Sequence, residues 1–99
     1  MYICTYRDWD SRRVSADDRL VIERVQTGVR LERRLLKVLK ALAEQKDLTL
    51  GDLLEGIVLH ALDGKSPFGK ETLTVIADLK RIYGLDLDSR HSHLLKERP

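Results

Sequence analysis

The sequence predicts a mainly α-helical fold with one short β-strand, and three features of its 99 residues support this. Apolar and polar side chains alternate over residues 25–31, as they do along a strand with one buried face. Apolar residues recur at helical spacing over residues 32–46 and again after Thr49. A third, shorter helical pattern follows the connection at residues 64–69.

Composition narrows the class of protein. A chain of 99 residues has room for one small domain, and a second subunit would help it to bury a sufficient core. Cys4 is the only cysteine, so an intrachain disulfide or a zinc site of several cysteines cannot form. No apolar run has the length of a signal peptide or of a membrane span. We therefore expect a soluble cytoplasmic protein without a membrane partner.

Charge is distributed unevenly along the chain, although the formal net charge is only +2. Residues 19–40 hold seven basic residues against two acids, a net +5. Residues 41–63 hold one basic residue against five acids, a net −4. A polyanion would bind the first of these stretches.

The predicted strand has one mainly apolar face and one mainly polar face. Its apolar face comprises Val25, Thr27, Val29 and Leu31. Its other face comprises Ile22, Arg24, Gln26, Gly28 and Arg30. No second alternating run follows, and an isolated strand would leave its backbone N–H and C=O groups unpaired. The same strand in a second copy of the chain is the expected partner.

Three helices are predicted after the strand. Residues 32–46 form the first, which ends at Asp47 because aspartate tolerates the left-handed conformation of a helix end. Thr49 is the expected N-cap of the second helix, which ends at Gly64. The third helix spans about residues 70–83. The chain thus divides into an N-terminal arm (1–24), a central unit (25–63) and a C-terminal part (64–99) with this helix and a polar tail.

The central unit resembles a known family. The strand VQTGVRLE leads into the helix ERRLLKVLKALAEQKD, the turn LT and the helix LGDLLEGIVLHAL, and this order resembles the ribbon-helix-helix family of bacterial DNA-binding repressors. The resemblance implies a homodimer in which two strands form an intermolecular antiparallel β-ribbon that enters the major groove of DNA. The helix at about 70–83 would be an additional C-terminal helix.

The resemblance also assigns candidate site residues. Gln26, Gly28 and Arg30 would contact bases, and arginine and glutamine can each bond bidentately to a purine. The phosphate-binding start of the second helix corresponds to Thr49, Leu50 and Gly51. Arg24 and Arg33 are further candidates for phosphate contacts. The dimer core would comprise Val25, Val29, Leu31, Leu35, Leu39, Leu42, Leu53 and Ile57.

The predicted function is sequence-specific binding of duplex DNA by a homodimeric transcriptional regulator, with no cofactor. An antitoxin-like protein whose residues 65–99 bind a protein partner is one alternative. A dimerisation module that has lost DNA binding is another, because Gly28 has no side chain and the second helix is acidic. No catalytic motif is present, so an enzyme is not expected. His91 and His93 allow a metal site, but a polar tail explains them more simply and no metal is expected.

Overall fold

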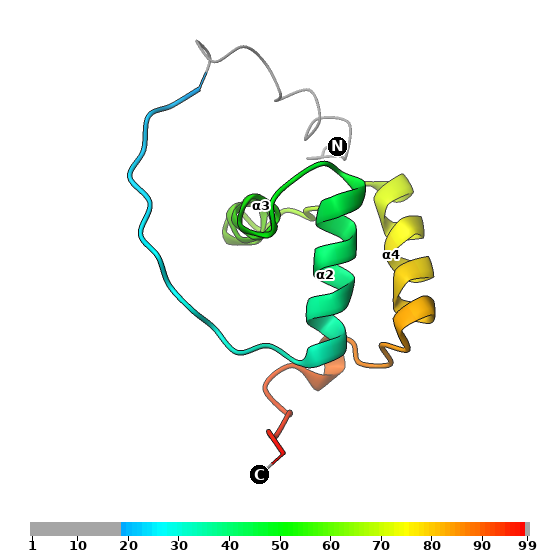
Figure 1. The fold of residues 1–99 in the computed structure, drawn as a ribbon. Helices are drawn as coiled ribbons and strands as arrows, with labels where there is room; N and C mark the ends of the chain where they lie inside the picture. The colour runs from blue at the N-terminus through cyan, green and yellow to red at the C-terminus, as the bar shows by residue number, and fades with distance from the viewer. Residues whose placement is uncertain (1–18, 99) are drawn as a thin grey trace.

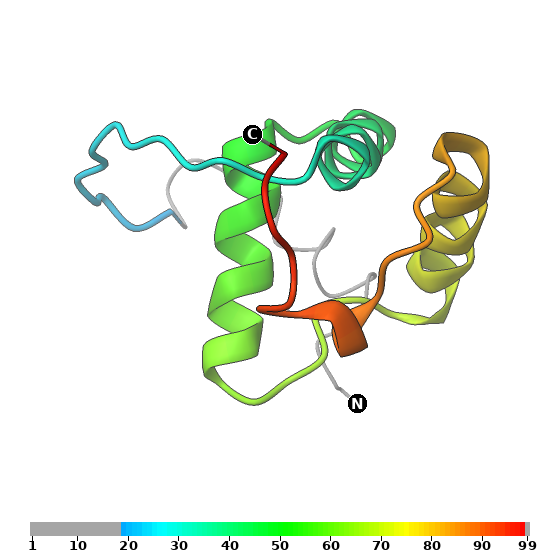
Figure 2. The same cartoon turned by 90° about the horizontal axis from the view of Figure 1, so that it is seen from below.

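The computed structural model describes residues 19–98, so most of the predicted N-terminal arm lies outside the described residues. The described chain contains α2 (Arg33–Gln45), α3 (Leu50–Leu62), α4 (Lys70–Tyr83) and a short 3-10 helix, η2 (Ser89–His91). Figure 1 shows α2 and α4 side by side, with α3 viewed almost along its axis and therefore crossing them. Figure 2 shows the same arrangement from below, with the C-terminal residues running back past the helices. The three helices lie close to their predicted positions.

The predicted β-strand is absent from residues 19–98. Residues 19–32, here called the extended segment, form neither a helix nor a strand and arc away from the helices before entering α2 (Figure 1). The ribbon-helix-helix fold class, with its antiparallel β-ribbon, is therefore wrong for the described structure. The physical reason is that an alternating pattern suits a β-strand, but a strand also needs a second strand to which its backbone can hydrogen-bond. No other segment of residues 19–98 pairs with this one.

The boundaries of the helices follow from local chemistry. At the start of α2, a carboxylate oxygen of Glu32 accepts a hydrogen bond from the Leu35 N–H at 2.9 Å. The helix ends where Asp47 adopts a φ of 57°, which confirms the predicted left-handed residue. Thr49 caps α3 as predicted, because its hydroxyl accepts a hydrogen bond from the Asp52 N–H at 3.0 Å. Gly84 ends α4 with a φ of 67°.

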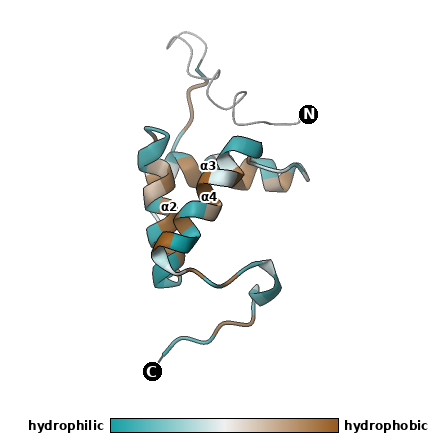
Figure 3. Ribbon diagram, turned by 90° about the vertical axis from the view of Figure 1, so that its right-hand side faces the viewer, coloured by the Kyte–Doolittle hydropathy of each residue, from teal (hydrophilic) through white to brown (hydrophobic). Residues whose placement is uncertain are grey.

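The core lies where the three helices meet. Leu42 and Leu53 are 1% and 0% exposed, so these two predicted dimer-core residues are buried within one chain. Leu39 and Ile57 pack against them together with Phe68, Val75, Ile76 and Leu79. Figure 3 shows the uneven hydropathy of the helices, with alternating brown and teal along α2. This small core leaves much apolar surface uncovered, including the predicted dimer-core residues Val25, Val29, Leu31 and Leu35.

The C-terminal residues fold back on the helices instead of extending away from them. Leu85 is buried, and Leu87 and Leu95 line the space beside α2. Arg34 holds the chain that follows α4 in this position. Its guanidinium donates a hydrogen bond to the backbone oxygen of Gly84 at 2.9 Å and forms an ion pair with Asp86 at 3.0 Å. The start of α2 is thereby attached to the chain that leaves α4.

Candidate nucleic-acid interface

The three predicted base-contacting residues lie in the extended segment, and all are exposed. A Cβ atom placed on Gly28 would have no heavy atom within 4 Å, so packing does not require glycine there. Gln26 and Gly28 are accessible to a large ligand. The structure therefore places these positions on an open surface, although not on a strand.

Arg30 is also exposed but contacts the C-terminal tail. Its guanidinium forms an ion pair with Glu97, in which Nε donates to one carboxylate oxygen at 3.2 Å. The side chains of both residues remain largely in solvent, so the pair is screened and contributes little stability. A phosphate or a base edge could compete with Glu97 for the same guanidinium.

Arg24, a predicted phosphate contact, is paired with an acid of α3. Its Nε and Nη2 atoms each donate to a Glu55 oxygen at 2.9 Å, which is a bidentate arrangement. The hydrogen bond from Arg24 lowers the pKa of Glu55, and Asp52 adds to the negative potential at Arg24. In the described structure this arginine is therefore neutralised by α3.

A basic stripe on α2 forms the strongest candidate surface. Arg33, Lys37 and Lys40 follow one another at intervals of four and three residues and are all exposed. They lie on the opposite side of the helix from Val38 and Leu42, which are buried. Within residues 19–98 none of the three basic side chains takes part in an ion pair. Of these three residues, only Arg33 was among the predicted phosphate contacts. The spacing of the three basic residues along the sequence could have identified the whole stripe.

Arg34, the basic neighbour of this stripe, has a structural role. It donates to Glu32 at 3.1 Å in addition to its contacts with Gly84 and Asp86. The Leu35 N–H and then the Arg34 guanidinium lower the pKa of Glu32, while partial burial opposes them. Glu32 is therefore expected to be ionised at neutral pH, which favours both the helix cap and this ion pair.

The start of α3 has the backbone geometry of an anion-binding site, but the side chains beside it are negatively charged. Thr49 caps the helix, and Leu50 and Gly51 form its first turn. The same turn contains Asp52, and Glu55 follows one turn later. These carboxylates oppose the attraction of the helix N-terminus for phosphate. Among the described residues, the basic stripe on α2 is a better match for a polyanion than this helix start.

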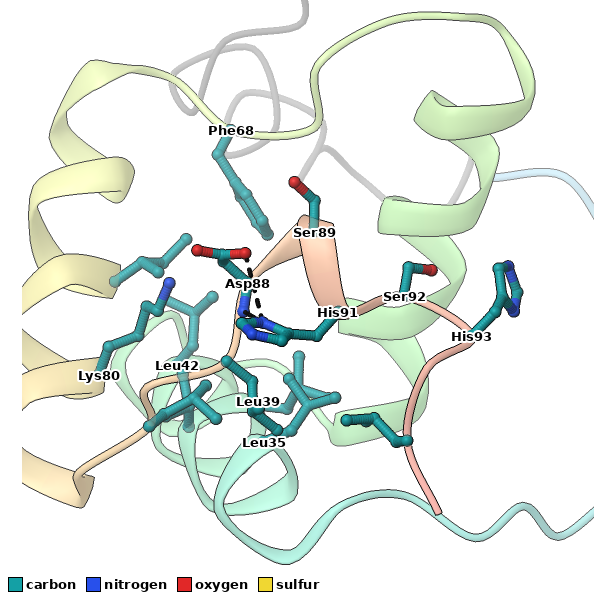
Figure 4. A pocket seen from close by; sticks show the side chains of 15 residues that line it. Leu35, Leu39, Leu42, Phe68, Lys80, Asp88, Ser89, His91, Ser92 and His93 are labelled. Atoms are coloured by element: carbon teal, nitrogen blue, oxygen red, sulfur yellow. Dashed lines mark hydrogen bonds and ion pairs between the residues drawn. The ribbon is translucent and has the colours of Figure 1, made fainter.

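An apolar cavity of about 510 Å³ lies between α2, α4 and the C-terminal residues. Its wall includes Leu35, Leu39, Phe68, Ile76, Leu87 and Leu95. Figure 4 shows Lys80, Asp88 and His91 at its polar side, with Asp88 and His91 linked by dashed lines. The Asp88 N–H donates to His91 Nδ1 at 3.0 Å, so this imidazole nitrogen acts as an acceptor within its own turn. The cavity can receive an apolar group, and its shape depends on the returning tail.

The two tail histidines are not gathered with further ligands. Between residues 19 and 98, no group of three or more His, Cys, Asp or Glu side chains is arranged to hold a metal ion. The structure likewise contains, in that same range, no helix that combines the length and the hydropathy needed to cross a bilayer. His91 contacts Asp88, and His93 is exposed.

Comparisons with known proteins leave the resemblance to repressors as a sequence-based prediction. No protein-family model matches the chain, and no significant match was found among curated proteins or solved structures.

Proposed function

We propose that the protein is a homodimeric transcriptional regulator that binds duplex DNA through the basic stripe of α2 and the adjoining extended segment. The observation that carries this proposal is the exposure of Arg33, Lys37 and Lys40 on one side of α2 without carboxylate partners in residues 19–98. Concentrated positive charge of this kind displaces counterions from a phosphate backbone and favours binding entropically.

The dimensions of the stripe suit a DNA strand. Lys40 lies seven positions after Arg33 on α2, which corresponds to roughly 10 Å along the helix axis. Phosphates of one strand rise by about 3.4 Å per nucleotide, so the stripe could follow about three of them. These contacts would position the protein on DNA without reading its sequence.

Sequence reading would come from the extended segment. Gln26 and Arg30 are exposed and carry the side chains best suited to adenine and guanine, respectively. Because Arg30 forms an ion pair with Glu97, this ion pair must open before Arg30 can contact a base. Helix α3 is a poor candidate for the major groove, because Asp52 and Glu55 give it negative charge and it contains no lysine or arginine.

A second candidate function is favoured by the apolar surface of the C-terminal part. Leu73 and Ile82 on α4 are exposed, as are Leu94 and Leu95 in the tail. Exposed apolar side chains of this kind gain stability when another protein covers them. An antitoxin-like role, with a protein partner bound to residues 65–98, would use this surface and could coexist with DNA binding.

The proposed function can be tested with two matched double variants. Lys37→Ala with Lys40→Ala removes two charges from the stripe, and Lys65→Ala with Lys70→Ala removes two exposed lysines elsewhere. Fluorescence anisotropy with duplexes selected from a random pool would be measured at several salt concentrations. We expect the stripe variant to bind more weakly and to lower the salt slope by about two, roughly one per lost phosphate contact, with no change in the control. Equal effects of both variants, or no binding by the unaltered protein, would refute the proposal.

A further inference from the structure

An ion pair joins the extended segment to α3. Arg24 and Glu55 form their bidentate ion pair, with both distances at 2.9 Å. The apolar neighbours of Arg24 on the extended segment, Val21, Ile22 and Val25, nevertheless remain exposed, and Val25 keeps 82% of its surface in solvent. The contact within one chain therefore leaves the apolar side chains of the segment uncovered.

Apolar side chains near Glu55 on α3 are also exposed. Val58, Leu59 and Leu62 follow Glu55 by one to two helical turns, and all three are exposed. These residues continue the side of α3 on which Glu55 receives Arg24. Two apolar surfaces thus flank one ion pair without covering each other, although both would gain stability from leaving water.

The charges of the two elements are complementary. Residues 19–31 contain three arginines and one acid, a net +2, whereas α3 contains two acids and no lysine or arginine, a net −2. Figure 1 shows the extended segment arcing away from the helices between its start and its junction with α2. A segment that extends away from the helices in this way can reach a neighbouring molecule as well as its own α3.

We infer that two copies of the chain exchange their extended segments, so that the segment of each copy lies along α3 of the other. Arg24 then pairs with Glu55 between chains, and the apolar side chains of the segment cover Val58, Leu59 and Leu62. Exchange of an identical element creates two equivalent contacts about a two-fold axis, and it keeps the pairing of Arg24 with Glu55 that is already present within one chain. It defines the interface of the homodimer in the proposed function and does not depend on DNA binding.

Charge inversion in two separate chains provides the test. Arg24→Glu places a carboxylate opposite Glu55, and Glu55→Arg places a guanidinium opposite Arg24, so each variant alone is repulsive. In a mixed dimer with exchanged segments, however, both contacts join opposite charges. We expect each variant to dimerise about tenfold more weakly than the unaltered chain and an equimolar mixture to regain most of the lost affinity. Sedimentation velocity with one variant fluorescently labelled would measure the mixed species.

Two further measurements make the outcome decisive. Circular dichroism of each variant should show unchanged helix content, because the inverted side chains are exposed. A single chain with both inversions should dimerise like the unaltered protein. If this double variant dimerises normally but the mixture does not recover, the ion pair lies within one chain and the exchange is refuted. A monomeric unaltered protein at micromolar concentration would also refute it, while DNA binding by such a monomer would still support a nucleic-acid function.

Discussion

Lys46 donates a hydrogen bond from Nζ to the Thr72 hydroxyl at 2.8 Å, and both residues are buried where the end of α2 meets α4. Burial lowers the pKa of Lys46 from its ordinary value of 10.5 to about 8, while the nearby Glu71 carboxylate opposes this shift. The ammonium group also lies at the C-terminus of α2, where the helix dipole favours positive charge. A cationic group thus forms part of the contact between these two helices.

The free energy of unfolding should increase as the pH is raised from about 8 towards 10.5. In this range the unfolded chain still binds the Lys46 proton while the folded chain has released it, so higher pH favours folding. Below pH 8 both states hold the proton, and the cost of burying the charge is fully present. The increase has an upper limit of about 3 kcal/mol. Urea unfolding at fixed protein concentration would measure it, and Lys46→Met should abolish this part of the pH dependence.

Leu53→Ala should lower the free energy of unfolding by about 2–5 kcal/mol, because truncation of a fully buried leucine leaves a cavity. The exposed fraction of Leu53 is 0%, so its whole side chain packs against other residues. Leu73→Ala is the matched control, since Leu73 is exposed on α4. Thermal or urea unfolding of both variants tests this prediction. Equal losses would show that the core has been placed incorrectly.

Thr49→Ala should destabilise the protein by about 1 kcal/mol, because the Asp52 N–H loses its acceptor at the start of α3. Thr49→Ser keeps a hydroxyl and should retain most of the stability. Urea unfolding of the two variants compares them directly. A similar loss in both would contradict a capping role.

Glu97→Gln should increase affinity for duplex DNA, because it removes a carboxylate that competes for Arg30. Arg30→Ala should reduce discrimination at one base pair in each half-site by about tenfold if Arg30 reads a purine. Titration of both variants against the preferred duplex and its single-base changes, at several salt concentrations, separates the possibilities. A uniform loss on all sequences would instead assign Arg30 to phosphate.

The helices could be predicted from the sequence because their signals are local. The spacing of Leu35, Leu39 and Leu42 identified α2, and Thr49 identified the start of α3. Alternation at residues 25–31 was insufficient for a strand, since pairing depends on a partner that the pattern does not contain.

Long-range contacts of polar residues were also beyond sequence reasoning. The approach of Glu97 to Arg30 joins positions 67 residues apart, and no periodicity relates them. Burial of Lys46 depends on Thr72 from another helix, whereas a lysine at a helix end is ordinarily expected in solvent. Of the candidate site, exposure of Gln26 and Arg30 could be predicted, but their neighbours could not.

The contacts of Arg34 with Glu32, Gly84 and Asp86 determine where motion of the extended segment can begin. They hold the first turn of α2 against the chain that follows α4, so the position of Glu32 relative to the helices is fixed. Once the ion pairs of Arg24 with Glu55 and of Arg30 with Glu97 open, the extended segment can change its direction by rotations at residues 19–31 while the three helices keep their packing. In the proposed function, this arrangement separates recognition by the extended segment from the folding of the helical body.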